Sequence, residues 1–329
     1  MVDMDLSSAD SNSVNDATPH ISPRDPNPDP DELPSLEDEA LLARSPTLGT
    51  GAFGTVHKVQ SRRGAYALKV VRSAASSGVA QVLLDRARQE VAIFEHLQRK
   101  AGGCHPAIIC ALRTHLVLRR NGDAEMYYLL GYDPGTDLAV VVAGTRSLRP
   151  PQLYAAAADM AEGLAFLHSQ GVLHRDVKPA NLYVTEGGQG RLLDLGAAVR
   201  LAPGETSSRG DMVGSRDYMP PSALEDGWSW THSADTDAWA LGRSLAEAAP
   251  ADAWLHEEVV QPLQAPGGGE ALQRVCTRLR QRASSQQQQQ QQQQGGHRGQ
   301  RRQLRTTTRR SLPSRRRRVR RPATRSRVR

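Results

Sequence analysis

The spacing of apolar residues, which changes along the middle of the chain, is what most constrains the fold. Residues 45–73 alternate apolar and polar side chains around a glycine-rich turn, which predicts short strands. Residues 82–100 then follow the three- and four-residue spacing of a helix, and two strand-like stretches come next, at 110–118 and 125–132. A longer helical pattern that begins with proline covers 151–170. Strands followed by helices predict an α+β domain of two lobes with a cleft between them.

Net charge separates this middle part from both ends of the chain. Residues 1–44, rich in Asp, Ser and Pro, are strongly acidic, whereas the region from 285 to 329 holds nine consecutive glutamines and then fifteen arginines without an acidic residue. Segments of this composition bury too little apolar surface to offset the entropy of an ordered chain. We therefore expect a disordered head at 1–44, a folded domain at 45–284 and a disordered tail at 285–329.

Cysteine content and hydropathy bear on the compartment. Cys104, Cys110 and Cys276 form neither a disulfide framework nor a zinc-binding pattern. The acidic start is the opposite of the basic region that opens a signal peptide, and no apolar run approaches the ~18 residues that span a bilayer. The sequence predicts a soluble intracellular protein, cytoplasmic or nuclear, without a membrane partner, and carries no signal of oligomeric state.

One charged residue lies where the helical pattern predicts a buried face. Glu90 falls in the same stripe as Ala87 and Phe94. A buried carboxylate is costly unless a cation meets it. Glu90 should therefore have a basic partner, unless it lies on the helix surface at a slightly different phase.

Five polar elements follow one another along the middle of the chain: the turn GTGAFG, Lys69, Glu90, the stretch HRDVKPAN and the stretch LDLG. The glycine pattern alone also marks dinucleotide-binding folds, but here it lies between two strands, which argues against that fold. In this order the five elements resemble the eukaryotic protein kinase family, serine/threonine type. The resemblance covers about 48–248 and implies a two-lobed protein kinase-like fold, with an N-lobe at 45–130 and a C-lobe at 134–284 that looks shortened.

The resemblance also implies a chemistry: transfer of the γ-phosphate of ATP, with Mg²⁺, to Ser or Thr hydroxyls of a protein substrate. Asp176 would accept the proton of the attacking hydroxyl, and Lys178 would stabilise charge on the transferred group. Asn181 and Asp194 would hold magnesium through oxygen atoms.

For the nucleotide, the resemblance implies that Lys69, aimed by Glu90, contacts the inner phosphates while backbone amides of the glycine turn cover the triphosphate. The residues expected around ATP are Leu48, Gly49, Gly51, Phe53, Gly54, Val56, Ala67, Lys69, Leu130, Tyr132, Asp133 and Tyr183.

The sequence departs from the family pattern in the C-lobe. Ser222 stands where the family has a glutamate that pairs with a buried arginine; Arg282 is the candidate for that arginine, and Glu225 could replace the missing acid. Thr206, Ser207 and Ser208 are candidate phosphorylation sites or plain loop residues. These departures bear on C-lobe stability and peptide docking more than on ATP chemistry.

Three other interpretations stay open. A pseudokinase or scaffold would bind ATP without transferring phosphate, although every charged group needed for transfer is present. A small-molecule phosphotransferase would share the catalytic loop but usually lacks the Arg-Asp-x-Lys-Pro run found here. The arginine run at 315–321 could bind nucleic acid or an import receptor, or be an unselected extension.

Overall fold

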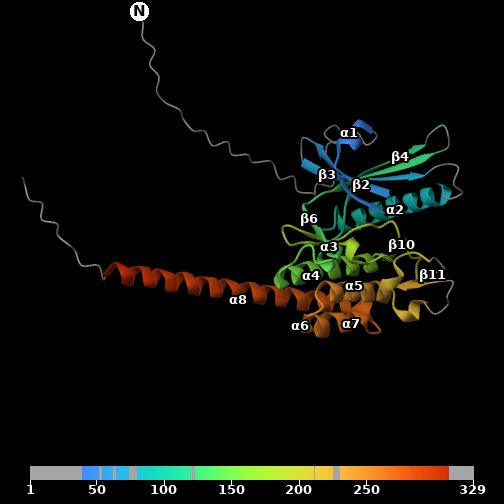
Figure 1. Cartoon of the computed structure of the whole chain (residues 1–329). Coiled ribbons are helices and arrows are strands. Elements are labelled where there is room, and N and C mark those ends of the chain that lie inside the picture. Colours follow the sequence, from blue (N-terminus) through green and yellow to red (C-terminus); the bar gives the residue numbers. More distant parts are fainter. Residues whose placement is uncertain are drawn as a thin grey trace, which may run out of the picture. The chain divides into compact units, whose positions relative to one another are not determined.

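A computed structural model of the chain describes most of its middle part (Figure 1). The described residues are 39–51, 54–61, 64–73, 80–118, 120, 123–210, 212–224 and 230–310. The chain divides into two compact units, Met1–Ala283 and Ser284–Arg329, and each is treated by itself below. Phe53, Glu225, most of the acidic head and the arginine run at 315–321 lie outside the described residues.

The N-terminal part of the first unit is an antiparallel five-stranded sheet in the order β1-β2-β3-β5-β4, with the predicted helix α2 packed on one face (Figure 1). That face buries Ala67, Tyr128 and Leu130 of the sheet against Phe94 and Leu97 of the helix. The elements are β1 (Thr47–Gly51), β2 (Gly54–Ser61), β3 (Gly64–Ser73), α2 (Ala80–Ala101), β4 (Ala111–Leu118) and β5 (Ala124–Gly131).

The opposite face of this sheet is covered by a helix that the sequence did not predict. Helix α1 (Glu39–Arg44) falls inside the stretch expected to be disordered. Its Leu42 is 7% exposed and packs with Val59, Leu68 and Leu129. Two consecutive leucines at the end of an otherwise polar head supply enough apolar surface for one helical turn to dock on the sheet.

The C-terminal part is mainly helical. The long helix α4 (Pro150–Ser169) buries the seam that its sequence predicts, including Leu153, Met160, Leu164 and Leu167. The other elements are β6 (Gly135–Asp137), α3 (Leu138–Val142), β7 (Val172–Leu173), η2 (Pro179–Asn181), β8 (Leu182–Thr185), β9 (Gly190–Leu192), β10 (Val199–Arg200), β11 (Ser207–Arg209), η3 (Arg216–Tyr218), η4 (Pro221–Leu224), β12 (Thr231–Ser233) and α5 (Ala234–Ala248). The α+β class is confirmed: a β-sheet N-lobe precedes a helical C-lobe.

After α5, the chain completes the C-lobe with few elements. Helix α6 (Ala253–Leu255), the π-helical segment η5 (His256–Val260) and α7 (Gln261–Gln264) follow one another directly and precede α8 (Gly268–Arg310). Leu272 and Leu279 of α8 are fully buried. Among the described helices, none has the length and apolar character needed to cross a membrane.

Helix α8 differs from the expectation of a tail without regular structure from residue 285. It continues through the glutamine run to Arg310, so residues 286–310 are helical. Glutamine and arginine are both favourable helix formers, and the helix is already nucleated by the packed turns before Ala283.

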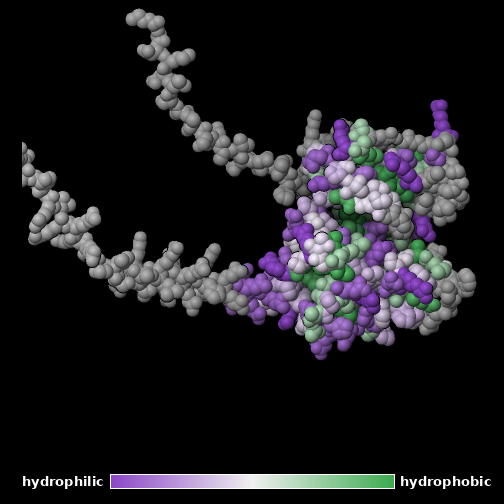
Figure 2. Space-filling view, viewed as in Figure 1, coloured by the Kyte–Doolittle hydropathy of each residue, from purple (hydrophilic) through white to green (hydrophobic). Residues whose placement is uncertain are grey.

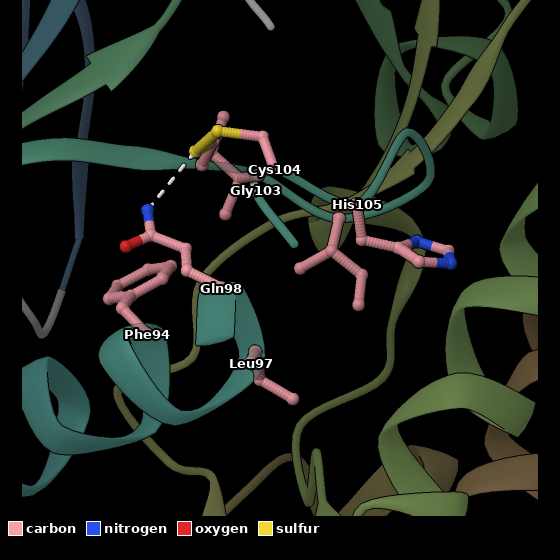
Figure 3. A pocket seen from close by; sticks show the side chains of 9 residues that line it. Phe94, Leu97, Gln98, Gly103, Cys104 and His105 are labelled. Atoms are coloured by element: carbon pink, nitrogen blue, oxygen red, sulfur yellow. Dashed lines mark hydrogen bonds between the residues drawn. A yellow bond between two sulfur atoms is a disulfide. The ribbon is translucent and has the colours of Figure 1, made fainter. Parts of the chain in front are cut away.

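A disulfide was also not expected. Cys104 and Cys110 are bonded across the turn between α2 and β4 (Figure 3). The side-chain amide of Gln98 donates to Cys110 Sγ at 3.3 Å and to the Ala111 carbonyl at 2.7 Å. The turn brings the two Cα atoms to 5.5 Å, within the range that a disulfide requires. Cysteine spacing in the sequence could not show this approach.

Candidate active site

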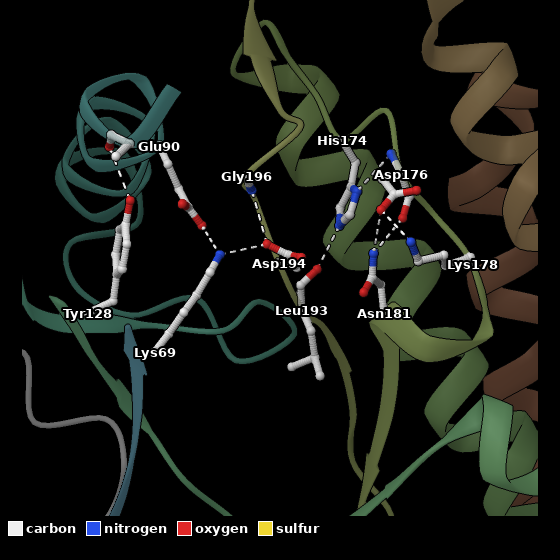
Figure 4. Close-up of polar contacts among 11 residues, drawn as sticks. Lys69, Glu90, Tyr128, His174, Asp176, Lys178, Asn181, Leu193, Asp194 and Gly196 are labelled. Carbon is white, nitrogen blue, oxygen red and sulfur yellow. Dashed lines mark hydrogen bonds and ion pairs between the residues drawn. The ribbon is translucent and has the colours of Figure 1, made fainter. Parts of the chain in front are cut away.

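The first cluster joins the N-lobe to the segment that follows β9. Lys69 Nζ lies 3.0 Å from Glu90 Oε1 and 2.8 Å from Asp194 Oδ1 (Figure 4). The alternation of β3 turns Lys69 toward α2, where Glu90 is 5% exposed. Burial alone would lower the pKa of Lys69, but the two carboxylates outweigh it and the pKa is raised. Lys69 therefore stays cationic between Glu90 and Asp194.

Tyr128 belongs to this cluster, although the sequence analysis did not single it out. It faces Lys69 across the ladder between β3 and β5, and the lysine Nζ lies 5.3 Å from the centre of its ring. Its hydroxyl donates to the Ala87 carbonyl of α2 at 3.3 Å. The ring therefore makes a cation–π contact with the lysine, and its hydroxyl links the sheet to α2. Along the sequence, Tyr128 comes two strands after Lys69 and lies in an apolar run. That position gives no sequence signal of such a role.

The second cluster lies between β7 and β8. Lys178 Nζ is 2.8 Å from Asp176 Oδ2, and the Asn181 amide donates to the same oxygen at 3.1 Å. Ser215, far along the chain, donates its hydroxyl to Asp176 Oδ1 at 2.8 Å and accepts from Lys178 at 3.1 Å. The structure thus gathers a carboxylate, an ammonium, an amide and a hydroxyl at one point, and Ser215 is the member that sequence reasoning missed.

Asp194 and Arg175, the residue before Asp176, have a backbone conformation that L-amino acids rarely adopt. Arg175 has φ of 64° and Asp194 has φ of 57°. Such positions cost about 1–3 kcal/mol each and persist only where the surroundings hold them. At Arg175 the holding group is Asp237, which accepts hydrogen bonds from the backbone N–H of His174 and of Arg175, both at 2.9 Å.

His174 connects the two clusters. Its Nε2 lies 3.0 Å from the carbonyl of Leu193, the residue before Asp194, so that nitrogen is the donor. Its Nδ1 then accepts from the backbone N–H of Asp176 at 3.4 Å. The ring therefore fixes the spacing between Asp176 and Asp194 (Figure 4).

Strands β1 and β2, which flank the glycine-rich turn, form one edge of the N-lobe sheet. Gly54 has φ of 114°, and a Cβ atom there would meet the Val70 carbonyl oxygen at 2.3 Å, so only glycine fits. Gly49 has open space around its Cα, and Leu48 is 46% exposed. Gly54 thus packs β2 closely against β3 beside the turn, whereas Leu48 and Gly49 of β1 leave open space for a ligand.

Four further residues expected around ATP lie on β2, β3, β5 and the connection that follows β5. Ala67 and Leu130 are buried neighbours on β3 and β5, and Val56 packs beside them. Tyr132 stacks under Lys58 of β2, with Nζ 4.9 Å from the ring centre. Apolar residues gather in the hollow between the two lobes in the space-filling view (Figure 2). An apolar slot with a few backbone polar groups is the setting that a purine base requires.

Asp194 and Asn181 fit the expected magnesium site by their chemistry. The Asn181 nitrogen donates to Asp176, which leaves the amide oxygen as the atom that can face a cation. Within the described residues no group of three His, Cys, Asp or Glu side chains could hold a metal. Mg²⁺ often takes only one or two protein oxygens and completes its shell with phosphates and water, so this sparse donor set suits it.

Ser222 stands in the structure without the acid that the family has there, and the alternative acid, Glu225, lies outside the described residues. Ser222 is exposed, and the Arg282 guanidinium lies over the Trp254 ring at 4.9 Å from its centre. The nearby segment is anchored instead by the Tyr218 hydroxyl, which donates to Glu247 of α5 at 2.9 Å, while Arg243 pairs with the same carboxylate. Arg282 thus contacts an aromatic ring, and the segment near Ser222 is held by Glu247 of α5.

The candidate phosphorylation sites lie on or beside β11. Ser207 and Ser208 form the strand with Arg209 and pair with β12, and Thr206 and Ser207 are exposed. In the segment that leads to these sites, the Ala197 carbonyl accepts a hydrogen bond from Arg175 Nε at 2.6 Å.

The chain is similar to known protein kinases over much of its length. The protein kinase domain family matches residues 42–294. Aurora/IPL1-related protein kinase 2 of Caenorhabditis elegans is 32% identical over 199 residues, 59% of this chain and 58% of that protein. The serine/threonine-protein kinase mos of Apteryx australis is 28% identical over 57% of this chain and 91% of its own length. The inactive serine/threonine-protein kinase PLK5 of Mus musculus is 28% identical over 61% of this chain but only 31% of that protein. The chain thus covers less than two thirds of the first of these relatives.

Proposed function

Because the chain belongs to the protein kinase family, we propose that it transfers the γ-phosphoryl group of ATP, with Mg²⁺, to serine or threonine hydroxyls of protein substrates. The observation that supports this most is the contact between Lys69, Glu90 and Asp194 on one side of the cleft, together with the Asp176 cluster on the other. Both clusters lie within one compact unit of the chain.

Asp176 orients the substrate hydroxyl and accepts its proton as the oxygen attacks the γ-phosphorus in line. Lys178, 2.8 Å from Asp176, offsets the negative charge on the transferred group. Ser215 bonds both side chains and so keeps them aligned.

Lys69 contacts the inner phosphates, and Glu90 holds the lysine in that direction. Asp194 and Asn181 would hold a magnesium ion, which would supply positive charge to stabilise the phosphates. The ring of His174, bonded to the Leu193 carbonyl and to the Asp176 N–H, links the segment that carries Asp194 to Asp176.

Family membership alone does not separate an active enzyme from a scaffold, since the similar proteins include one named inactive. The complete set of Lys69, Glu90, Asp176, Asn181 and Asp194, held in two hydrogen-bonded clusters that His174 connects, favours the active enzyme. A scaffold has no need to keep all five.

Transfer from labelled ATP to a generic basic protein tests the proposal. Asp176→Asn should lower the rate by at least ~10²-fold while ATP still binds, because the base is lost and the cleft is not. Lys69→Met should lower both transfer and ATP affinity.

Asp85→Asn and Lys100→Met are matched controls on exposed positions of α2 and should keep the wild-type rate. Wild type that binds ATP yet transfers no more label than Asp176→Asn would identify a pseudokinase. Phosphate appearing on a small molecule and not on protein would point to the other class of phosphotransferase.

A further inference from the structure

A hairpin of β8 and β9 contacts the connection between the two lobes. Strands β8 and β9 place Tyr183 and Arg191 directly opposite each other. The Tyr183 hydroxyl donates to the backbone carbonyl of Asp133 at 3.0 Å, and the Arg191 guanidinium pairs with the Asp133 carboxylate. One cross-strand pair therefore holds both the main chain and the side chain of a single connecting residue.

Burial indicates that these contacts are more than surface pairing. The side chain of Arg191 is only 9% exposed and that of Asp133 is 25% exposed. A guanidinium at this depth requires a carboxylate partner, and loss of either partner would leave an uncompensated charge. The ion pair thus fixes where Asp133 lies relative to β9.

The structure leaves room for the Tyr183 ring beside Gly135. A Cβ atom on Gly135 would lie 2.7 Å from Tyr183 Cε1, so glycine at 135 leaves the room that the ring occupies. Burial, with the nearby Tyr132 and Asp133, raises the pKa of Tyr183 to about 12, and the phenol remains a neutral donor in ordinary buffers. On the other side of the connection, Lys58 lies over the Tyr132 ring.

We propose that Tyr183 and Arg191 form a hinge latch, which positions the backbone of Asp133 for the base of the nucleotide. Tyr183 is then a positioning residue that acts through Asp133 and determines affinity for the adenine end of ATP. The inference rests on the proposed function, because it takes the cleft as the nucleotide site. It goes further by assigning base affinity to a pair outside the phosphate-binding and catalytic residues.

Loss of the latch should change the binding and kinetic constants for ATP in a characteristic way. The base does not change during phosphoryl transfer, so a contact to it stabilises the ground state and the transition state equally. Loss of the latch should raise Kd and KM for ATP and leave kcat unchanged. Loss of one hydrogen bond of this kind corresponds to about three- to ten-fold in affinity.

The experiment uses the full chain and titrates adenosine and Mg·ATP by calorimetry, with kcat and KM measured beside it. Tyr183→Phe keeps the ring and removes only the donor; it should weaken adenosine and ATP by the same factor, three- to ten-fold, at constant kcat. Arg191→Met should weaken both ligands further, and Arg191→Lys should recover part of the loss.

Tyr154→Phe is the matched control, because it removes a hydroxyl that bonds to Asp252 in the C-lobe; it should change neither Kd. If wild type binds ATP and Tyr183→Phe and Arg191→Met bind it equally well, the latch is wrong and the proposed function stands. A fall in kcat at constant Kd would also overturn the latch. Wild type that binds neither adenosine nor ATP would overturn the proposed function, and the latch with it.

Discussion

At the scale of single residues, Asp237 shows how one buried carboxylate can hold an otherwise unfavourable turn. It is 2% exposed and accepts from the backbone N–H groups of His174 and Arg175, and its Oδ2 lies 2.9 Å from His168 Nε2. Burial alone would raise its pKa, but the hydrogen bond and charge of His168, with His174, lower it below the ordinary 3.8. The ionised form is therefore the one that the fold stabilises.

Asp237 makes the free energy of unfolding depend on pH. In the unfolded chain the carboxyl has a pKa near 3.9, and in the folded chain the pKa is lower. The contribution of Asp237 is therefore present above about pH 4 and is lost as the pH falls through the folded pKa. Asp237→Asn should cost about 3 kcal/mol at pH 7 and should flatten the fall in stability between pH 5 and pH 2.

Denaturant unfolding across this pH range measures the effect. Asp85→Asn, an exposed aspartate on α2, is the control and should follow the wild-type curve. Equal slopes for wild type and Asp237→Asn would mean that Asp237 does not carry the acid dependence.

At the scale of elements, the turn between α2 and β4 links the disulfide to the site. Helix α2 carries Glu90, and its Gln98 bonds to Cys110 and Ala111 at the start of β4. The Cys110 carbonyl accepts from Gly131 N–H at the end of β5, at 3.1 Å. The bonded turn thus fixes the end of α2 against the strand that leads into the connection between the lobes (Figure 3).

A reducing agent should lower the free energy of unfolding by about 2 kcal/mol, the value expected for a closed loop of this length. The melting temperature should fall on reduction of wild type and should not respond in the double variant Cys104→Ser/Cys110→Ser. Cys276→Ser, which changes the free buried cysteine, should keep the response to reductant. Identical melting of wild type with and without reductant would contradict a stabilising disulfide.

At the scale of the whole molecule, the folded unit and the tail should be separable. The first unit ends at Ala283, which is buried, and Leu272, Val275 and Leu279 complete its core. A chain that ends at Ser285 should melt as the full chain does and keep its transfer activity. A chain that ends at Gly267 lacks three fully buried side chains worth roughly 2 kcal/mol each, a loss comparable to total domain stability, and should not fold.

The same shortened chain tests the predicted role of the arginine run. If the tail binds RNA or DNA through phosphates, the full chain should bind in low salt with an affinity that falls steeply as salt rises, and the chain ending at Ser285 should not. Equal affinity of the two chains would remove this hypothesis. A fluorescently labelled duplex and a salt titration by anisotropy are sufficient.

The sequence predicted the parts of the fold that depend on local order. Alternation and helical spacing placed the five strands and helices α2 and α4, because burial of one face imposes its period on the chain. It also predicted that Glu90 needs a cation, since an acidic residue in an apolar stripe is costly wherever the helix packs. The five ordered motifs, which resemble those of protein kinases, indicate the family from the sequence alone.

What only the tertiary structure decided are the contacts between residues that are distant in the chain. Ser215 beside Asp176, Tyr183 and Arg191 on Asp133, Cys104 bonded to Cys110, and α1 docked on the sheet gave no periodic or motif signal. The physical reason is that spacing records which face of an element is buried, whereas a hydrogen bond or a disulfide depends on how two elements approach each other. That approach is determined by the packing of the whole unit.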